Sequence, residues 1–225
     1  MATLGTIKTD VATQLGATDG ASSVPKRDRC INRARRKFYS ERRWSFCFRS
    51  ATVTITSQLG DFPTLYNEKF DPECVYYFSG ETKYEFEKVP WADVDLYDDG
   101  SYVYGINKQS GQIKINHTDV ASLTMDYYQL PADAAISTAD DAVVELASDI
   151  EPITTLSIAY WWLSTERSTA NFDRHMDLYR NVLLPQAVQA DTANQAPKPI
   201  MTLTSPQGYN RRYSQRVIKG YVGRG

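Results

Sequence analysis

The chain begins with two segments in which hydrophobic residues recur at helical spacing. The first predicts a helix over residues 2–16, with apolar side chains at spacings of three and four and a stop at Gly16. The second predicts a helix that continues to Arg42 or Arg43. On a helical wheel drawn at about 100° per residue, Ile31, Ala34 and Phe38 fall together and form its apolar face. We expect both helices to bury these faces in a common core.

From residue 51 the repeat changes to the two-residue alternation that is typical of strands. Alternating apolar residues and threonines over 51–56 predict the first strand. Hairpins are predicted around residues 80–81 and 107–111, and a long strand over 122–130. Between the hairpins, Pro90–Tyr97 predicts one short helix. Residues 51–131 are therefore predicted to form an antiparallel β unit of five or six strands.

Helical spacing returns after a loop rich in alanine and aspartate. A third helix is predicted to begin at Glu151, and a fourth near Thr169 with a kink at Pro185. Beyond residue 190 no apolar repeat remains. The predicted fold class is α+β, a four-helix bundle with an antiparallel β insertion between the second and third helices, and an extended C-terminal arm.

The chain is expected to divide where these patterns change. The expected segments are the first two helices, the β insertion, the last two helices and a basic arm. They cover residues 1–50, 51–148, 149–190 and 191–225, respectively.

Charge is sorted along the chain, although the formal net charge is only -2. Residues 20–50 hold ten Lys/Arg and two acids, and residues 51–191 hold eight Lys/Arg and twenty-three acids. Residues 192–225 hold six Lys/Arg and no acid. A basic helix, an acidic middle and a basic tail on one chain favour complementary packing between copies.

The basic residues of the second helix fall in an arc roughly opposite its apolar face. They are Lys26, Arg29, Arg33, Arg36 and Arg43. One partner for this basic face is DNA, whose phosphates bind cations without regard to sequence. The other is the acidic middle of a neighbouring copy. Both stay open, and the second is favoured because the chain itself supplies the acidic partner.

The sequence holds no pattern that is typical of catalysis. It lacks a phosphate-binding GxxxxGK[ST] loop and a GxSxG nucleophile turn. His117 and His175 have no further ligands at metal spacing, and the three cysteines are expected to be free thiols. The longest apolar run, residues 158–163, is too short to cross a bilayer. We therefore expect no enzyme, no cofactor, no metal and no membrane partner.

Four segments in a fixed order carry a family resemblance. The first helix is followed by residues 31–36 (INRARR), and residues 44–46 (WSF) precede a threonine-rich strand. Residues 101–105 (SYVYG) precede a hairpin and a strand ending in YYQLP, and the aromatic segment AYWW at 159–162 precedes the fourth helix. Over about residues 1–190 the chain resembles the head-to-tail connector (adaptor) proteins of tailed bacteriophages, including the tail tubular proteins of short-tailed phages.

The resemblance implies a structural protein of the virion, assembled in the host cytoplasm and located at the head-tail junction. Such proteins form rings, commonly of twelve copies, beneath the portal. They extend the DNA channel, touch the DNA transiently and without sequence preference, and offer a docking surface to a tail or nozzle protein. The alternative is a sequence-nonspecific nucleic-acid-binding module that uses the basic second helix.

The C-terminal segment of several such proteins reaches into the portal. A basic, tyrosine-rich arm suits that role, because many weak arms on one ring bind tightly together. The expected portal-binding residues are Lys198, Tyr209, Arg211, Arg212, Tyr213, Arg216, Lys219 and Tyr221.

Overall fold

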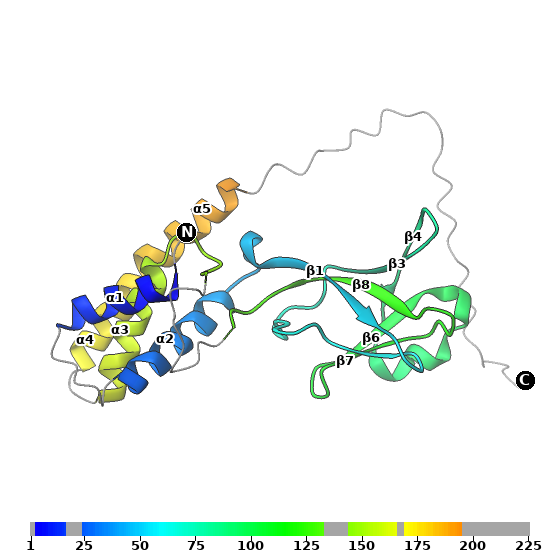
Figure 1. Ribbon diagram of the computed structural model, residues 1–225, viewed down its shortest axis with the longest axis horizontal. Coiled ribbons are helices and arrows are strands. Elements are labelled where there is room, and N and C mark those ends of the chain that lie inside the picture. The colour runs from blue at the N-terminus through cyan, green and yellow to red at the C-terminus, as the bar shows by residue number, and fades with distance from the viewer. Residues whose placement is uncertain (1–2, 17–23, 133–143, 166–168, 195–225) are drawn as a thin grey trace, which may run out of the picture. The chain divides into compact units, whose positions relative to one another are not determined.

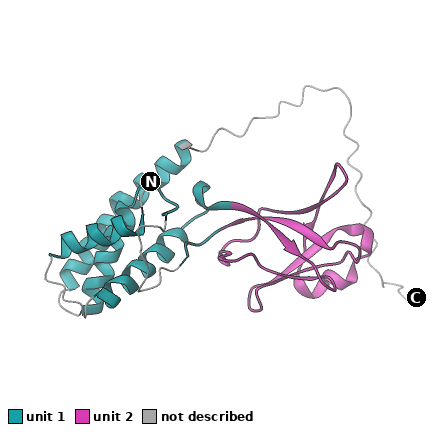
Figure 2. Cartoon of the chain, viewed as in Figure 1, with its two compact units in different colours: residues 1–48, 129–198 teal, residues 49–128, 199–225 magenta. Residues whose placement is uncertain are grey.

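The structure is a computed structural model that describes residues 3–16, 24–132, 144–165 and 169–194 (Figure 1). It divides into two compact units (Figure 2). The described residues of the first, helical unit lie in Met1–Phe48 and Gln129–Lys198. Those of the second, β unit lie in Arg49–Tyr128.

The helical unit is organised around one central helix. Helix α3 (Glu151–Thr165) packs against α1 (Leu4–Leu15), α2 (Val24–Tyr39) and α4 (Thr169–Leu178). Every residue of α3 from Pro152 to Trp161 is buried. A helix that is buried on all sides needs no amphipathic stripe, which explains its almost continuous run of apolar and small residues. The unit also contains the 3₁₀ helix η1 (Ser45–Cys47), the π-helix η5 (Tyr179–Leu183) and α5 (Leu184–Asn194).

Helix α2 ends at Tyr39, about one turn before the predicted Arg42 or Arg43. Trp44 folds back over the last turn, where its indole N–H donates to the Phe38 carbonyl at 2.9 Å. The Trp44 and Phe38 rings lie 4.6 Å apart, and Trp44 is fully buried. Because the indole occupies the space above the helix end, the chain turns there instead of continuing the helix.

Pro185 is preceded by a π-helical turn, where the sequence predicted a kink. The Leu184 N–H donates to the carbonyl of Tyr179, five residues earlier. Proline has no N–H, and its ring collides with the carbonyl four residues back in a regular helix. The wider π-turn accommodates this collision, so α4, η5 and α5 follow one another without an intervening loop.

The β unit contains eight strands in two four-stranded sheets. The first sheet has the order β1-β8-β3-β4, and the second the order β2-β7-β6-β5. The strands are β1 (Phe48–Thr54), β2 (Leu59–Asp61), β3 (Cys74–Ser79), β4 (Thr82–Glu85), β5 (Glu87–Lys88), β6 (Val103–Asn107), β7 (Gln112–Ile115) and β8 (Ser122–Tyr128).

One hydrophobic core joins the two sheets. It takes Val53 from β1 and Met125 from β8 in the first sheet, and Tyr104 and Ile113 from β6 and β7 in the second. The 3₁₀ helix η2 (Trp91–Leu96) covers β6, and its buried Val94 packs against Val103. Another short 3₁₀ helix, η3 (Asp99–Ser101), leads into β6. The alternating pattern of the sequence therefore marks the inward side chains of both sheets.

The predicted fold class is wrong. The described residues form five α-helices and two four-stranded sheets instead of a four-helix bundle with one antiparallel insertion. The sheets separate at Phe86, whose N–H bonds to Val75 in the first sheet, while the next N–H bonds to Tyr102 beside the second. There β5 pairs with β6 in parallel, with Glu87 opposite Val103. Alternation shows which side chains are buried but not which strand is the neighbour, so the sequence pattern could not show this change of sheet.

Candidate interaction surface

Helix α2 separates its basic side chains from its apolar ones. Ile31, Ala34 and Phe38 are buried in the helical unit. On the other side Arg29, Arg33 and Arg36 are exposed, and Lys26 is half-buried. The fifth predicted residue, Arg43, is exposed but lies beyond the end of α2, because the helix stops at Tyr39. The structure therefore brings four of the five predicted basic residues together on one helix.

A pocket of about 350 Å³ lies between α2 and α3, and the predicted basic residues form much of its wall. It is lined by Lys26, Arg29, Cys30, Arg33, Tyr160 and Ser164. The Arg33 guanidinium lies 4.4 Å from the centre of the Tyr160 ring, a cation–π contact that orients it. The Lys26 ammonium lies 6.0 Å from the Trp161 ring. We call this site the α2–α3 basic pocket.

The Cys30 thiol reports the electrostatics of this pocket. Its Sγ lies 3.8 Å from the Ser164 hydroxyl. Burial raises the pKa of Cys30 above its usual value, while the hydrogen bond between Cys30 and Ser164 and the charges of Lys26, Arg33 and Arg29 act to lower it. The thiol remains protonated at neutral pH, so it is not an activated nucleophile. The pocket thus places three cations around one small, partly apolar hollow.

Arg35 belongs to the buried side of α2 and not to its basic face. Its guanidinium donates to the Glu145 carboxylate and to the Ala132 carbonyl, both at 2.8 Å. The Tyr39 hydroxyl also donates to Glu145 and accepts from the Ala147 N–H at 3.0 Å. This network connects Glu145 and Ala147, in the segment before α3, to α2. The sequence held a signal for it, because an arginine among the apolar positions of a helical wheel needs a buried partner.

Two further buried carboxylates neutralise basic residues within the helical unit. Asp28 lies 3.1 Å from Lys8 of α1, so this ion pair joins α1 to α2. Asp191 of α5 accepts from the Ser45 N–H at 3.0 Å, and its other oxygen lies 3.5 Å from Arg42. These pairs were not expected from the sequence. They show that only part of the positive charge around α2 is available to a partner.

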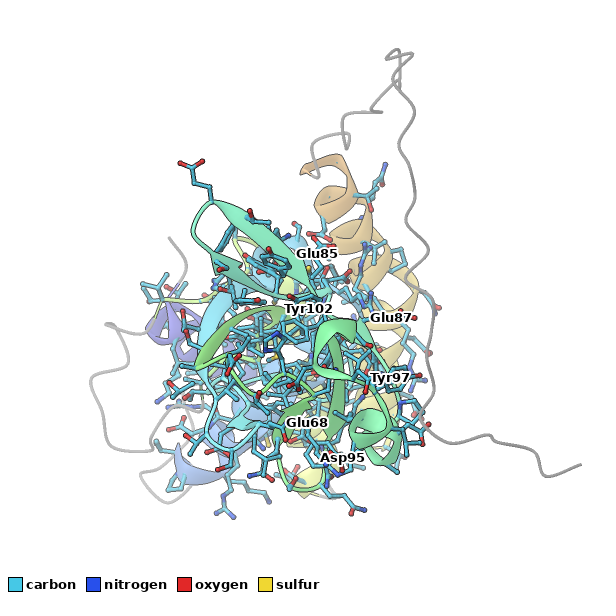
Figure 3. The ribbon with its side chains drawn as sticks, turned by 90° about the vertical axis from the view of Figure 1, so that its right-hand side faces the viewer. Glu68, Glu85, Glu87, Asp95, Tyr97 and Tyr102 are labelled. Carbon is cyan, nitrogen blue, oxygen red and sulfur yellow. The ribbon has the colours of Figure 1, made fainter. Side chains whose placement is uncertain are left out.

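The β unit presents carboxylates on its surface. Figure 3 looks onto a side of this unit that carries exposed Glu68, Glu85, Glu87 and Asp95. Residues 49–128 hold thirteen Asp/Glu and six Lys/Arg. Most of the lysines among these six bases already bind carboxylates of the same unit. The pairs are Lys88 and Lys108 with Asp71, Lys114 with Asp95, and Lys83 with Glu85. The β unit therefore keeps a clear negative excess.

A cluster of aromatic side chains belongs to the same unit as these carboxylates. Tyr102 stacks on His117 with 5.1 Å between the ring centres, and its ring centre lies at the same distance from that of Tyr84. Tyr77 in turn stacks on Tyr84, with 5.2 Å between the ring centres. The Tyr102 hydroxyl and the burial of Tyr77 raise the Tyr77 pKa to about 12. Neutral phenols next to acids offer large, rigid contact area, which is common at protein interfaces.

Other predicted features can be placed only in part. The portal-binding residues from Lys198 to Tyr221 lie outside the described residues. The three cysteines form no disulfide. Across the described ranges, no group of His, Cys, Asp and Glu side chains has the geometry of a metal site. None of the helices described there is long and apolar enough to cross a membrane.

Comparison with known proteins supports the resemblance seen in the sequence. No curated protein matches the chain. A family model described as SU10 adaptor protein matches residues 2–200, which is nearly the whole chain. Such a family implies a place in the virion, association with portal and tail proteins, and a structural rather than an enzymatic role. The chain belongs to the SU10 adaptor family, a family of phage head-to-tail adaptor proteins.

Proposed function

We propose that this protein forms the head-to-tail adaptor ring of a tailed phage, docks beneath the portal, extends the DNA channel and offers the tail its attachment surface. The family match over residues 2–200 is the observation that carries this proposal. The expected ring has twelve copies and assembles in the host cytoplasm.

The contrast between the basic face of α2 and the acidic β unit supports assembly from identical copies. The exposed arginines lie on α2 of the helical unit, whereas the β unit has seven more acids than bases. Of the described residues, no carboxylate lies within ion-pair distance of Arg29 or Arg33. Surfaces with opposite charge on one chain favour contact between neighbouring copies and disfavour contact between like surfaces.

The arm supports the portal contact. From Lys198 onward it combines six Lys/Arg with three tyrosines, at 209, 213 and 221, and has no acid. If the arm is extended, as the sequence predicts, it can bind by adding backbone hydrogen bonds at a sheet edge and by placing side chains in grooves. A ring would present every arm at once, so that modest individual affinities combine.

The exposed row of Arg29, Arg33 and Arg36 also supports a second function, nonspecific binding to DNA. This function predicts binding by the single chain, with an affinity that falls steeply as salt rises. Fluorescence anisotropy with a labelled duplex measures it directly. Binding that is absent at about 0.1 M salt would remove this second function.

Sedimentation velocity of the protein, of its phage's portal and of their mixture tests the main proposal. We expect the mixture to form one larger species in which adaptor and portal sediment together. An adaptor that remains monomeric and sediments separately from the portal would contradict the proposal.

A further inference from the structure

The α2–α3 basic pocket contains the groups that bind an anion and no acid of its own. None of the six residues that line it is Asp or Glu, and three are cationic. The Tyr160 hydroxyl adds a hydrogen-bond donor at the wall opposite α2, whereas the Ser164 hydroxyl already donates to the Trp161 carbonyl at 2.9 Å. A carboxylate placed there would meet both charge and hydrogen-bond donors.

The cations of this pocket are already held in place. The Arg33 guanidinium rests 4.4 Å from the Tyr160 ring, and Arg29 Nε donates to the Pro25 carbonyl at 3.3 Å. Held side chains lose less entropy when they bind a ligand than free ones do. Arg33 covers one face of the Tyr160 ring and Tyr160 is buried, so the ring offers no open face on which a nucleic-acid base could stack. The pocket therefore suits a single anionic group better than a nucleotide.

We propose that the α2–α3 basic pocket receives a carboxylate side chain from the acidic surface of the β unit of a second copy. That surface carries exposed Glu68 and Glu87, and also exposed Glu85 and Asp95, which already pair with Lys83 and Lys114 (Figure 3). This inference rests on the proposed function, since it names the partner of the basic face in the assembled ring.

Charge complementarity selects this occupant over DNA. The β unit of every copy has thirteen acids against six bases, so it attracts the pocket and repels a phosphate backbone. Four of its six cations are already bound to acids of the same unit, and the acids still outnumber the bases by seven. DNA also has to slide through a channel, and a pocket that grips single phosphates would oppose sliding.

A charge-swap experiment tests the contact. One variant reverses the pocket, R29E/R33E, and a second reverses part of the acidic surface, E68K/E87K. A control variant, D177K, reverses an exposed acid of α4 outside the pocket. Sedimentation velocity at about 0.05 M salt and up to about 1 mM protein measures self-association, and circular dichroism melting confirms that each variant folds.

In either reversed variant, pocket and surface have the same charge, so self-association should weaken at least about tenfold. In an equal mixture the two variants alternate, and every contact again joins opposite charges. The mixture should return to within about threefold of the wild type, and D177K should match the wild type. Wild-type protein that does not associate, reversed variants that associate normally, or a mixture that is not rescued would overturn the inference.

Cys30 gives a second readout that needs no charge reversal. In the wild-type protein, alkylation of Cys30 by neutral N-ethylmaleimide, followed by peptide mass spectrometry, should slow as protein concentration rises and recover at high salt. Alkylation that is independent of concentration would contradict an occupied pocket.

A duplex-binding measurement on R29E/R33E identifies the alternative occupant. Lost DNA binding with unchanged self-association would overturn the inference and assign the pocket to DNA. Portal binding is measured separately with the same variants. Normal self-association of both reversed variants with retained portal binding would refute only this contact, whereas absent portal binding by the wild type would refute the proposed function.

Discussion

At the residue scale, the basic side chains around α2 serve two different purposes. Arg35 and Arg42 bind the buried carboxylates of Glu145 and Asp191, within the helical unit. Arg33, two residues before Arg35, is exposed beside the α2–α3 basic pocket. Neighbouring arginines therefore differ in role because the helix turns one toward the core and the next toward solvent.

Replacing the buried Arg35 should destabilise the protein far more than replacing an exposed arginine. R35M leaves the Glu145 carboxylate buried without its cation, which costs about 3–5 kcal/mol of unfolding free energy. R174M changes an exposed arginine of α4 and should cost less than about 0.5 kcal/mol. Urea unfolding of both variants measures the difference, and equal stabilities would contradict the role given to Arg35.

Alkaline pH should destabilise the protein through its buried phenols. Burial, followed by the Glu145 charge, raises the Tyr39 pKa far above its usual value, and burial raises that of Tyr104 to about 12. Above about pH 10 the unfolded chain releases phenol protons that the folded protein retains, so the free energy of unfolding falls as pH rises.

Urea unfolding between pH 8 and pH 11 measures this fall, and Y39F should reduce its slope. At neutral pH the same variant leaves Glu145 and the Ala147 N–H short of a partner, at a cost of about 1–3 kcal/mol. Stability that stays constant to about pH 11 would argue against buried neutral phenols.

At the element scale, the packing of η2 on β6 depends on the absence of a side chain. A Cβ added to Gly105 would lie 2.8 Å from both the Trp91 Cα and the Val94 Cγ2. The Trp91 Cα belongs to the backbone and cannot move away by a change of side-chain rotamer. Gly105 therefore lets the 3₁₀ helix approach the strand, and the chain needs glycine there for space rather than for turn geometry.

G105A should destabilise the β unit by about 1–3 kcal/mol through overpacking. G100A is the matched control, because nothing lies within 4 Å of an added Cβ and Gly100 is not among the glycines with positive φ. It should change stability by less than about 0.5 kcal/mol. Thermal unfolding compares the two, and equal melting temperatures would show that η2 does not need close contact with β6.

The sequence predicted elements better than it predicted their pairing. The helix ending at Gly16 and the hairpin of β6 and β7 follow local spacing and turn chemistry, and the structure confirms both. The parallel pairing of β5 with β6 was missed because two residues, Glu87 and Lys88, form all of β5. Such a short strand is set by tertiary contacts and leaves no alternation to detect.

The candidate site, too, was predicted only where a feature depends on one element alone. The amphipathic pattern of α2 identified the exposed arginines, because exposure is a property of one helix. It could not identify Tyr160 and Ser164, which reach the pocket from α3 more than a hundred residues later. Nor could it identify Glu145, whose role as a buried counterion depends on where the chain brings it in the folded protein.

At the scale of the whole molecule, the chain combines a basic surface on α2 with a negatively charged β unit. Helix α2 exposes its arginines, and the β unit exposes carboxylates and contains stacked tyrosines. A molecule with complementary surfaces repels itself in the wrong orientation and attracts itself in the right one. This property, together with family membership, is the basis for proposing a ring.

Removing the arm should separate portal binding from folding. A chain that ends at Pro197 lacks every expected portal-binding residue but keeps all the described helices and strands. We expect it to melt within about 2 °C of the full chain and to lose at least about tenfold in portal affinity. The control replaces the three arm tyrosines by alanine and keeps the cations, which distinguishes aromatic docking from charge alone. Full affinity of the shortened chain, measured by biolayer interferometry, would exclude the arm as the portal contact.

Electron microscopy of the full chain mixed with its phage's portal tests the central proposal most directly. We expect averaged images to show copies of this protein as a closed ring on the portal axis, with α2 of each copy facing the β unit of the next. Portal particles without added density, or single copies attached off the axis, would contradict the adaptor ring.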